Sequence, residues 1–316
     1  MKTYNFISKQ SDECCIALGF FDGIHTGHQQ LIESMLNTAK EKNISSAVFT
    51  FAQSPSVALG KSESRILMKY DDKISAFDRM KIDKCFAPNF LDLRDISAED
   101  FAENILIKTL NAKAIFCGYN YRFGKFASGG CGLLSEICEK NGVDFFVVSP
   151  VCYDGTAVSS SRIRNLIEQG KLYSANALLK YPFSISGEII HGKQNGRTVG
   201  IPTINQSIPD YFVTPRFGAY ASFAILNGVR YNAVTNIGIR PTVLGEGVNC
   251  ETHILDNFSG ELYGKKIRTQ LLWFERDERK FQNLNELAQQ ISRDISHIEE
   301  LKIYEKYRNG EYKKCL

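Results

Sequence analysis

The chain has 316 residues, 43% hydrophobic and 23% charged, a balance typical of globular proteins. Its formal net charge of +3 is too small to indicate nucleic acid or a membrane surface as a partner. No apolar stretch approaches the ~18 residues that span a bilayer, and the absence of CxxC spacing among nine cysteines argues against zinc and thioredoxin-like chemistry.

Length and cysteine usage also predict the organisation and the compartment. At roughly 150 residues per domain, this length predicts two domains. Residues 1–12 are polar and lack the apolar core of a signal peptide. Many free thiols are typical of a reducing compartment. We therefore expect a cytoplasmic protein.

The first half of the chain alternates strand-like and helix-like segments. Apolar runs predict strands at 14–20, 46–51, 112–117 and 143–148, and helical periodicity predicts helices at 27–42, 71–82, 98–110 and 133–141. Thr26 followed by Gln29 fits a capping box at the start of the first helix. Strands alternating with helices predict a parallel, doubly wound α/β sheet, which binds ligands at the carboxyl ends of its strands.

The pattern changes after two short predicted helices, at 161–170 and 172–180. Period-two segments follow at 183–191, 219–226, 230–237, 250–255 and 266–274. They predict an antiparallel barrel or sandwich. A terminal amphipathic helix, expected to pack on it, carries an apolar stripe of Leu284, Leu287, Ile291, Ile295 and Ile298. The predicted domains are therefore 1–180 and 181–316.

The turn after the first predicted strand carries the first chemical motif, GFFDGIHTGH at 19–28. A helix N-terminus favours anions, and Gly23 and Gly27 allow a close approach of backbone to phosphate. His25 and His28 can donate hydrogen bonds to phosphate oxygens during displacement at phosphorus. The alternative is a Gly-rich turn whose histidines cap the helix. A zinc site is disfavoured, because the histidines lie three apart with no evident third ligand.

A second motif, VSSSRIR at 158–164, lies at the predicted start of a later helix. Its hydroxyls and N–H groups would bind further phosphate oxygens, and Arg162 adds positive charge. A Ser-rich helix start alone is a common N-cap. The motif becomes specific only when it follows an HxGH turn.

The second half carries a third motif, HGKQNGRTVGIPTIN at 191–205. Its glycines at spacing four predict a loop that can wrap phosphates, but it lacks the GK[ST] ending of a P-loop. Thr203 and Asn205 offer oxygen ligands suited to Mg²⁺. Downstream, Glu251 on a predicted strand could take a proton from an attacking hydroxyl. The alternatives are a simple turn, a solvated glutamate, and a structural role for His191 and His253.

Together these segments resemble a known family. HxGH with SSxxxR is the signature of the nucleotidyltransferase superfamily. GFFDGIHTGHQ, GYNYRFG, GRTVGIPTIN, NIGIRPT, ETHILDNFSGELYGKKI and FERDERKF resemble the bacterial bifunctional riboflavin kinase/FAD synthetase family, from about Cys14 to Phe281. The resemblance implies a Rossmann-like nucleotidyltransferase domain followed by a six-stranded antiparallel β-barrel with a terminal helix. It implies ATP-dependent phosphorylation of riboflavin to FMN in the second half and adenylylation of FMN to FAD in the first, both with Mg²⁺.

The resemblance also implies roles for individual residues. Glu251, as general base on the flavin 5′-hydroxyl, and His25 and His28 would be catalytic. Thr203 and Asn205 would hold Mg²⁺, and Asn236 and Thr242 would contact flavin. The expected ATP- or phosphate-binding residues are Gly19, Phe21, Gly23, Gly27, Asn120, Ser160, Ser161, Arg162, Gly192, Arg197, Gly200 and Thr203. The partners implied are the small molecules riboflavin, FMN and ATP.

The chain departs from the family pattern at four places. A TFxPHP segment reads TFAQSP at 50–55 and so lacks its histidine, and Ala157 replaces a basic residue before the serines. PTIN replaces PTAN, and Glu275 stands where an apolar residue is common. The first two departures leave open a monofunctional riboflavin kinase with a weakened or inactive N-terminal domain. A non-catalytic flavin- or nucleotide-binding regulator is a third alternative, against which the intact Glu251 argues.

Overall fold

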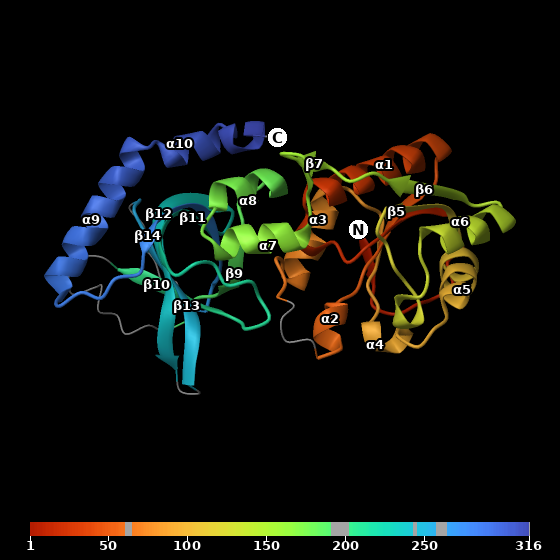
Figure 1. Ribbon diagram of the computed structural model, residues 1–316, viewed down its shortest axis with the longest axis horizontal. Helices are drawn as coiled ribbons and strands as arrows, with labels where there is room; N and C mark the ends of the chain where they lie inside the picture. The colour runs from red at the N-terminus through yellow and green to blue at the C-terminus, as the bar shows by residue number, and fades with distance from the viewer. Residues whose placement is uncertain (61–64, 191–201, 243–244, 257–263, 316) are drawn as a thin grey trace. The chain divides into compact units, whose positions relative to one another are not determined.

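The computed structural model describes residues 1–316 except 61–64, 191–201, 243–244, 257–263 and 316, and it leaves aside the side chains at 240–246, 284, 314 and 315. The chain folds into two compact units, Met1–Ser159 and Ser160–Leu316 (Figure 1). Among the described residues, no helix has the length and apolar character needed to cross a membrane.

The first unit is built on a six-stranded parallel sheet of order β1-β4-β3-β2-β5-β6. The strands are β1 Lys2–Tyr4, β2 Cys14–Leu18, β3 Ser45–Phe49, β4 Lys84–Phe86, β5 Ala112–Gly118 and β6 Asp144–Val148. From β2 the chain runs outward through β3 and β4, and it then returns to β5 on the other side of β2. The point between β2 and β5 is therefore the topological switch of a doubly wound sheet, which confirms the predicted fold class.

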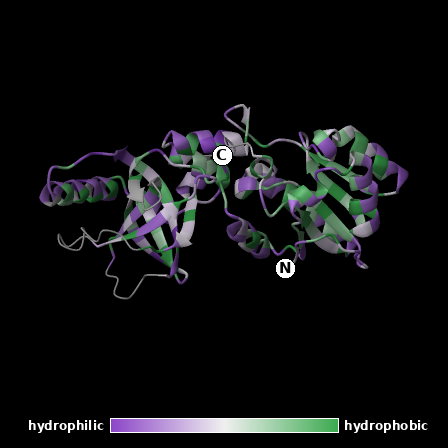
Figure 2. Ribbon diagram, turned by 90° about the horizontal axis from the view of Figure 1, so that it is seen from below, coloured by the Kyte–Doolittle hydropathy of each residue, from purple (hydrophilic) through white to green (hydrophobic). Residues whose placement is uncertain are grey.

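Helices cover both faces of this sheet. Helices α1 (Thr26–Lys42) and α3 (Tyr70–Arg79) pack on one face, and α5 (Ala98–Asp100), the π-helix η2 (Phe101–Thr109) and α6 (Cys131–Lys140) pack on the other. The central strands are hydrophobic on both sides, as Figure 2 shows in green. The remaining elements are η1 Asp22–Ile24, α2 Pro55–Ala58, α4 Phe90–Leu93, η3 Lys125–Ala127 and the hairpin β7 Cys152–Tyr153 with β8 Thr156–Ala157.

The predicted capping box at α1 is wrong. The N-cap is His25, and Thr26 is already the first helical residue. The side chain of Gln29 donates from Nε2 to the carbonyl of Ile24 at 2.8 Å instead of reaching back to the backbone of a capping residue. The preceding 3-10 turn changes the direction in which the chain enters the helix, and local spacing does not reveal this.

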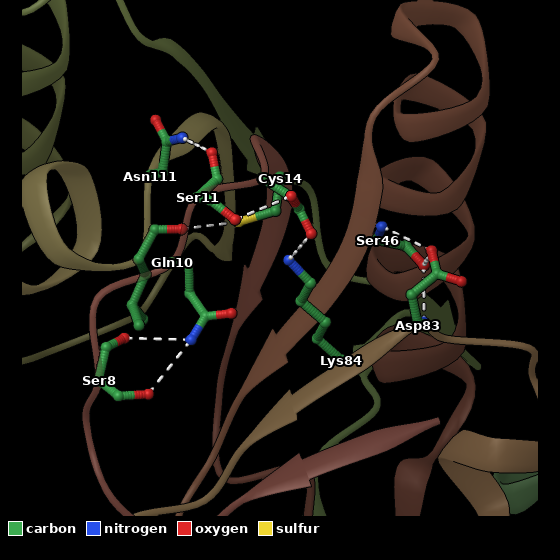
Figure 3. A network of polar contacts seen from close by, with 10 residues as sticks. Ser8, Gln10, Ser11, Cys14, Ser46, Asp83, Lys84 and Asn111 are labelled. Carbon is green, nitrogen blue, oxygen red and sulfur yellow. Dashed lines mark hydrogen bonds and ion pairs between the residues drawn. The ribbon is translucent and has the colours of Figure 1, made fainter.

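Side chains fasten the amino edge of the sheet, at the starts of the strands (Figure 3). Asp83 Oδ2 accepts hydrogen bonds from Ser46 N at 2.9 Å and from Ser46 Oγ at 2.7 Å. The buried Lys84 Nζ lies 3.5 Å from Asp12 Oδ2. These contacts join β2, β3 and β4 at one end, whereas the predicted motif residues follow the carboxyl ends of the strands.

The second unit contains a six-stranded antiparallel sheet of order β10-β13-β12-β11-β14-β9. The strands are β9 Ser184–Glu188, β10 Thr203–Ile208, β11 Gly218–Leu226, β12 Val229–Thr242, β13 Gly245–Ile254 and β14 Lys266–Asp277. The edge strands approach each other, because Ile190 bridges to Asn205 and Gln206 Nε2 donates to Ile185 O at 3.4 Å. The sheet is therefore a nearly closed barrel, as predicted.

The barrel interior contains a chain of polar side chains, which we call the hydroxyl ladder. Ser222 and Thr235 hydroxyls lie 2.7 Å apart, and Thr235 and Thr252 hydroxyls 2.9 Å apart. Thr269 Oγ1 lies 3.5 Å from Thr252 and donates to Gln206 Oε1 at 2.7 Å. All five side chains are buried. Their mutual hydrogen bonds offset the cost of taking polar groups out of water.

Helices α7 (Ser160–Glu168) and α8 (Leu172–Leu179) open the second unit, and α9 (Leu284–Glu300), α10 (Ile303–Arg308) and η5 (Glu311–Cys315) close it. The stripe of α9 meets the barrel through the buried Ile298. Arg276 on β14 and Asp294 on α9 form a shielded ion pair at 2.8 Å. Glu275, which departs from the family pattern, accepts a hydrogen bond from His297 on α9 at 2.6 Å, and this bond raises the pKa of His297.

Candidate functional sites

The GFFDGIHTGH segment forms the turn from β2 into α1, at the carboxyl edge of the parallel sheet. Phe21 and Gly23 both have positive φ, 57° and 76°, so the backbone folds back on itself before the helix begins. Asp22 Oδ1 accepts a hydrogen bond from the backbone N–H of Leu67 at 2.8 Å, which fixes the turn. The turn therefore presents His25 and His28 at the start of α1.

The two histidine rings stack, with centroids 3.7 Å apart and planes 18° from parallel. The buried Phe21 ring meets the His28 ring edge-on at 5.3 Å. A side chain at Gly27 would place its Cβ 3.3 Å from the His25 ring, so that ring would have to shift by a few tenths of an ångström. The HxGH spacing thus places the two rings against each other at the start of α1.

Burial favours the neutral form of both histidine rings. Burial lowers the pKa of His25 to about 4. Burial, and then the charges of His25 and Lys73, hold the pKa of His28 well below its usual range. Among the described residues, His25 Nδ1, His28 Nδ1 and Thr26 Oγ1 are buried with no hydrogen-bond partner. Unpartnered buried polar atoms are uncommon and often mark a ligand site.

Asn120 lies in the turn that follows β5, and β5 is the neighbour of β2 in the sheet. Its exposed side chain therefore stands at the same carboxyl edge as the histidines. The Asn120 side chain folds back toward Gly118, because a Cβ built there would lie in ordinary contact with Asn120 Oδ1, at 3.5 Å. The topology thus brings GFFDGIHTGH and GYNYRFG to one edge.

Lys73 belongs to this edge and was missed by the sequence analysis. Its buried ammonium donates hydrogen bonds to Phe20 O at 3.0 Å, Thr50 Oγ1 at 3.1 Å and Phe51 O at 3.1 Å. It thereby joins the segments after β2 and β3, including the TF of TFAQSP. Burial lowers the pKa of Lys73 to about 8, and the nearby Asp22 opposes that change. A lysine on an amphipathic helix is normally solvated, so nothing in the local sequence distinguished it.

The serine motif forms the first turn of α7, in the second compact unit. Ser160, Ser161 and Arg162 are its first three residues. Arg164 Nη1 donates to Ser161 Oγ at 3.4 Å. When SSxxxR is counted from Ser159, its arginine is Arg164, which the sequence analysis left out. The first turn of α7 thus offers hydroxyls beside two arginines.

The barrel strands align three motif residues in a row. Asn205 on β10 and Asn236 on β12 are the direct register partners of Glu251 on β13. Opposite residues on neighbouring strands have Cβ atoms about 5 Å apart and share one face of the sheet. Their chain neighbours, such as Thr252 and Gln206, belong to the buried ladder. The row therefore lies on the outer face of the barrel.

Hydrogen bonds extend this row. Thr203 Oγ1 donates to Glu251 Oε1 at 2.5 Å, and Asn249 Nδ2 donates to Asn205 Oδ1 at 2.8 Å. Hydroxyl, amide and carboxylate oxygens form the hard donor set that Mg²⁺ prefers, with the remaining positions filled by phosphates and water. In the part of the chain that is described, no three His, Cys, Asp or Glu side chains gather to hold a metal. The oxygen donors of Thr203, Asn205 and Glu251 are of the kind that suits Mg²⁺.

Four predicted residues cannot be placed in either site. Gly192, Arg197 and Gly200 lie outside the described residues, as does the side chain of Thr242. His253, given a structural role as one alternative, lies with Nδ1 2.9 Å from the carbonyl of Pro202 and so braces the start of β10.

Two different family models match the two halves of the chain. The FAD synthetase family model matches residues 7–162, and the riboflavin kinase family model matches residues 179–302. The bifunctional riboflavin kinase/FMN adenylyltransferases of Bacillus subtilis and Escherichia coli K12 are each 32% identical, with 92% of this chain and 93% of theirs covered. A Streptococcus pneumoniae crystal structure titled macrolide-efflux protein has a TM-score of 0.84 and 27% identity, covering 94% of this chain and 98% of that one.

Proposed function

Because the chain belongs to the family of bifunctional riboflavin kinase/FMN adenylyltransferases, we propose that its two reactions use the two sets of residues described above. The chain phosphorylates riboflavin to FMN and adenylylates FMN to FAD, with ATP as the donor in both reactions. The assignment depends on one observation: the Asn205–Glu251–Asn236 row and the stacked histidines belong to different compact units. We place the functional boundary at 180/181, and the riboflavin kinase match from residue 179 supports it.

In the kinase reaction Glu251 is the general base. It accepts the proton of the flavin 5′-hydroxyl as that oxygen attacks the γ-phosphorus of ATP, and ADP leaves. The hydrogen bond from Thr203 orients the carboxylate, and Asn236 beside it contacts the flavin. Mg²⁺ held by Thr203 and Asn205 would neutralise charge on the triphosphate. Gly192, Arg197 and Gly200 stay predictions for ATP binding, and Thr242 for flavin binding.

In the adenylyltransferase reaction a phosphate oxygen of FMN attacks the α-phosphorus of ATP, and pyrophosphate leaves. The neutral rings of His25 and His28 donate hydrogen bonds to phosphate oxygens, where charge increases during the displacement. Three buried polar atoms at the start of α1 lack a partner within the described part of the chain, which supports ligand binding there. The other proposed ligands of ATP are Gly19, Phe21, Gly23, Gly27, Asn120, Ser160, Ser161 and Arg162, to which we add Arg164.

Metal dependence tests the proposed role of Mg²⁺ in both reactions. The purified chain, given riboflavin and ATP with Mg²⁺, should form FMN and then FAD, resolved by chromatography. Chelation with EDTA should stop both steps, and added Mg²⁺ should restore them. Either product forming at an unchanged rate in EDTA would overturn the metal assignment. Accumulation of FMN alone would instead favour the monofunctional kinase.

We propose a cytoplasmic location, which the free thiols support.

Lys73→Met should lower the rate of FAD formation roughly tenfold or more, since each buried acceptor left unpaired costs about 1–3 kcal/mol. Phe20 O, Thr50 Oγ1 and Phe51 O lose the lysine as a donor, and of these Phe20 O keeps its hydrogen bond from Thr50 Oγ1 at 3.0 Å. FMN formation, measured in the same preparation, should be unchanged. The exposed Lys140→Met is the matched control and should retain both activities. Equal losses of both activities in Lys73→Met would show that it acts on overall folding.

A further inference from the structure

Two cysteines meet beside the Asn120 turn. Cys117 Sγ and Cys131 Sγ lie 3.8 Å apart, in van der Waals contact. Cys117 is the penultimate residue of β5, and Cys131 is the first residue of α6. A disulfide has an S–S distance of about 2.05 Å, so a modest approach of the two sulfur atoms would join them.

We propose that Cys117 and Cys131 form a reversible disulfide that lowers the adenylyltransferase activity. The pair has no part in the mechanism described above, and its two sulfurs come from different elements on the face of the sheet that α6 covers. In a reducing compartment such a bond would be transient, as is usual for redox-sensing disulfides. The inference rests on the proposed role of Asn120 in binding ATP.

The surroundings set the order of oxidation. Cys131 is partly exposed, whereas Cys117 is fully buried, and burial raises the pKa of the Cys117 thiol. A peroxide therefore reacts first at Cys131: its sulfur gains the hydroxyl oxygen of hydrogen peroxide, forming a sulfenic acid, and water leaves. Cys117 Sγ then attacks that sulfur, the S–S bond forms, and the hydroxyl leaves as a second water with the Cys117 proton. A dithiol reductant reverses the reaction by exchange.

The link to activity lies in the contacts that Cys131 makes. Its Sγ lies 3.6 Å from Gly118 O and 3.5 Å from Tyr119 O, the carbonyls that lead into Asn120. Moving this sulfur toward Cys117 breaks both contacts and pulls the start of α6 toward the end of β5. The turn that carries Asn120 is thereby displaced. Cys138, also on α6 and buried, is the competing partner.

The test treats the full chain with hydrogen peroxide and follows both products and the thiols. Peptide mapping should find a Cys117–Cys131 linkage. FAD formation from FMN should fall about tenfold, because ångström-scale misplacement of a binding group has effects of this size or larger. FMN formation from riboflavin should stay unchanged, and dithiothreitol should restore FAD formation.

Three variants complete the test. Cys117→Ser and Cys131→Ser should keep their FAD formation after peroxide, whereas the exposed Cys152→Ser should lose it as the unchanged chain does. The proposal is overturned if mapping finds no Cys117–Cys131 linkage, finds Cys117 joined to Cys138, or finds the linkage without any loss of FAD formation. Mapping does not depend on Asn120, so Asn120→Ala separately tests its role: full activity there would refute the site assignment and leave the linkage intact.

Discussion

Glu251→Gln should reduce the formation of FMN from riboflavin by about 10²- to 10⁴-fold, the usual contribution of a positioned general base. Glutamine keeps an oxygen that can accept the hydrogen bond from Thr203 Oγ1, now 2.5 Å from Glu251 Oε1. It cannot take the proton of the flavin hydroxyl. Conversion of added FMN to FAD should remain, because the turn that carries His25 and His28 belongs to the other compact unit. Rates of both steps, measured by chromatography, check this.

Two further variants sharpen this prediction. Glu251→Ala removes both the base and the acceptor for Thr203, so it should be at least as severe as glutamine. Glu188→Ala removes an exposed carboxylate from β9 of the same barrel and should leave both rates unchanged. If Glu251→Gln kept a third of the kinase rate, Glu251 would not be the base. Loss of both activities with a preserved fold would refute separate sites.

The opposite pattern is expected for His28→Ala. FAD formation should fall about 10²- to 10³-fold, the effect of removing one preorganised donor to developing charge, while FMN accumulates from riboflavin. The substitution also removes the ring that stacks on His25 at 3.7 Å, so part of the loss reflects the orientation of His25. His28→Asn restores a donor without the stacked ring and should recover only part of the rate.

The control for this substitution is Gln30→Ala, an exposed position two residues further along α1. It should change neither product. FMN formation in the same sample reports only on the barrel unit. Thermal unfolding of His28→Ala is therefore needed as well, and it should show that the first unit is intact. Full FAD formation in His28→Ala would refute a role for His28 in the adenylyltransferase reaction.

The sequence predicted most of the elements that carry regular apolar patterns. β2 and α1 were predicted because Cys14–Leu18 is an unbroken apolar run and the buried side chains of α1 recur at helical spacing. β1 and β4 have three residues each, too few for any periodicity to show. β10 was missed because Gln206 is buried where alternation expects an apolar residue. Only the neighbouring strands explain that glutamine.

The candidate sites divide in the same way. His25, His28 and Glu251 could be proposed from the sequence because their chemistry is local to a motif or carried by resemblance. Lys73 was not predictable, because its three acceptors come from two other segments of the chain. Glu275 departs from the family pattern, and only the fold showed its partner, His297 on α9. Local sequence patterns do not reveal such contacts between distant segments of the chain.

The hydroxyl ladder has a consequence for catalysis. A slip of one residue between β13 and its neighbours would turn Glu251 inward and Thr252 outward, since side chains alternate along a strand. Such a slip would also take the Thr252 hydroxyl away from Thr235 and Thr269, and each buried polar group left without a partner costs about 1–3 kcal/mol. The buried hydroxyls inside the barrel thus stabilise the strand register that places Glu251, the proposed base, on the outer face.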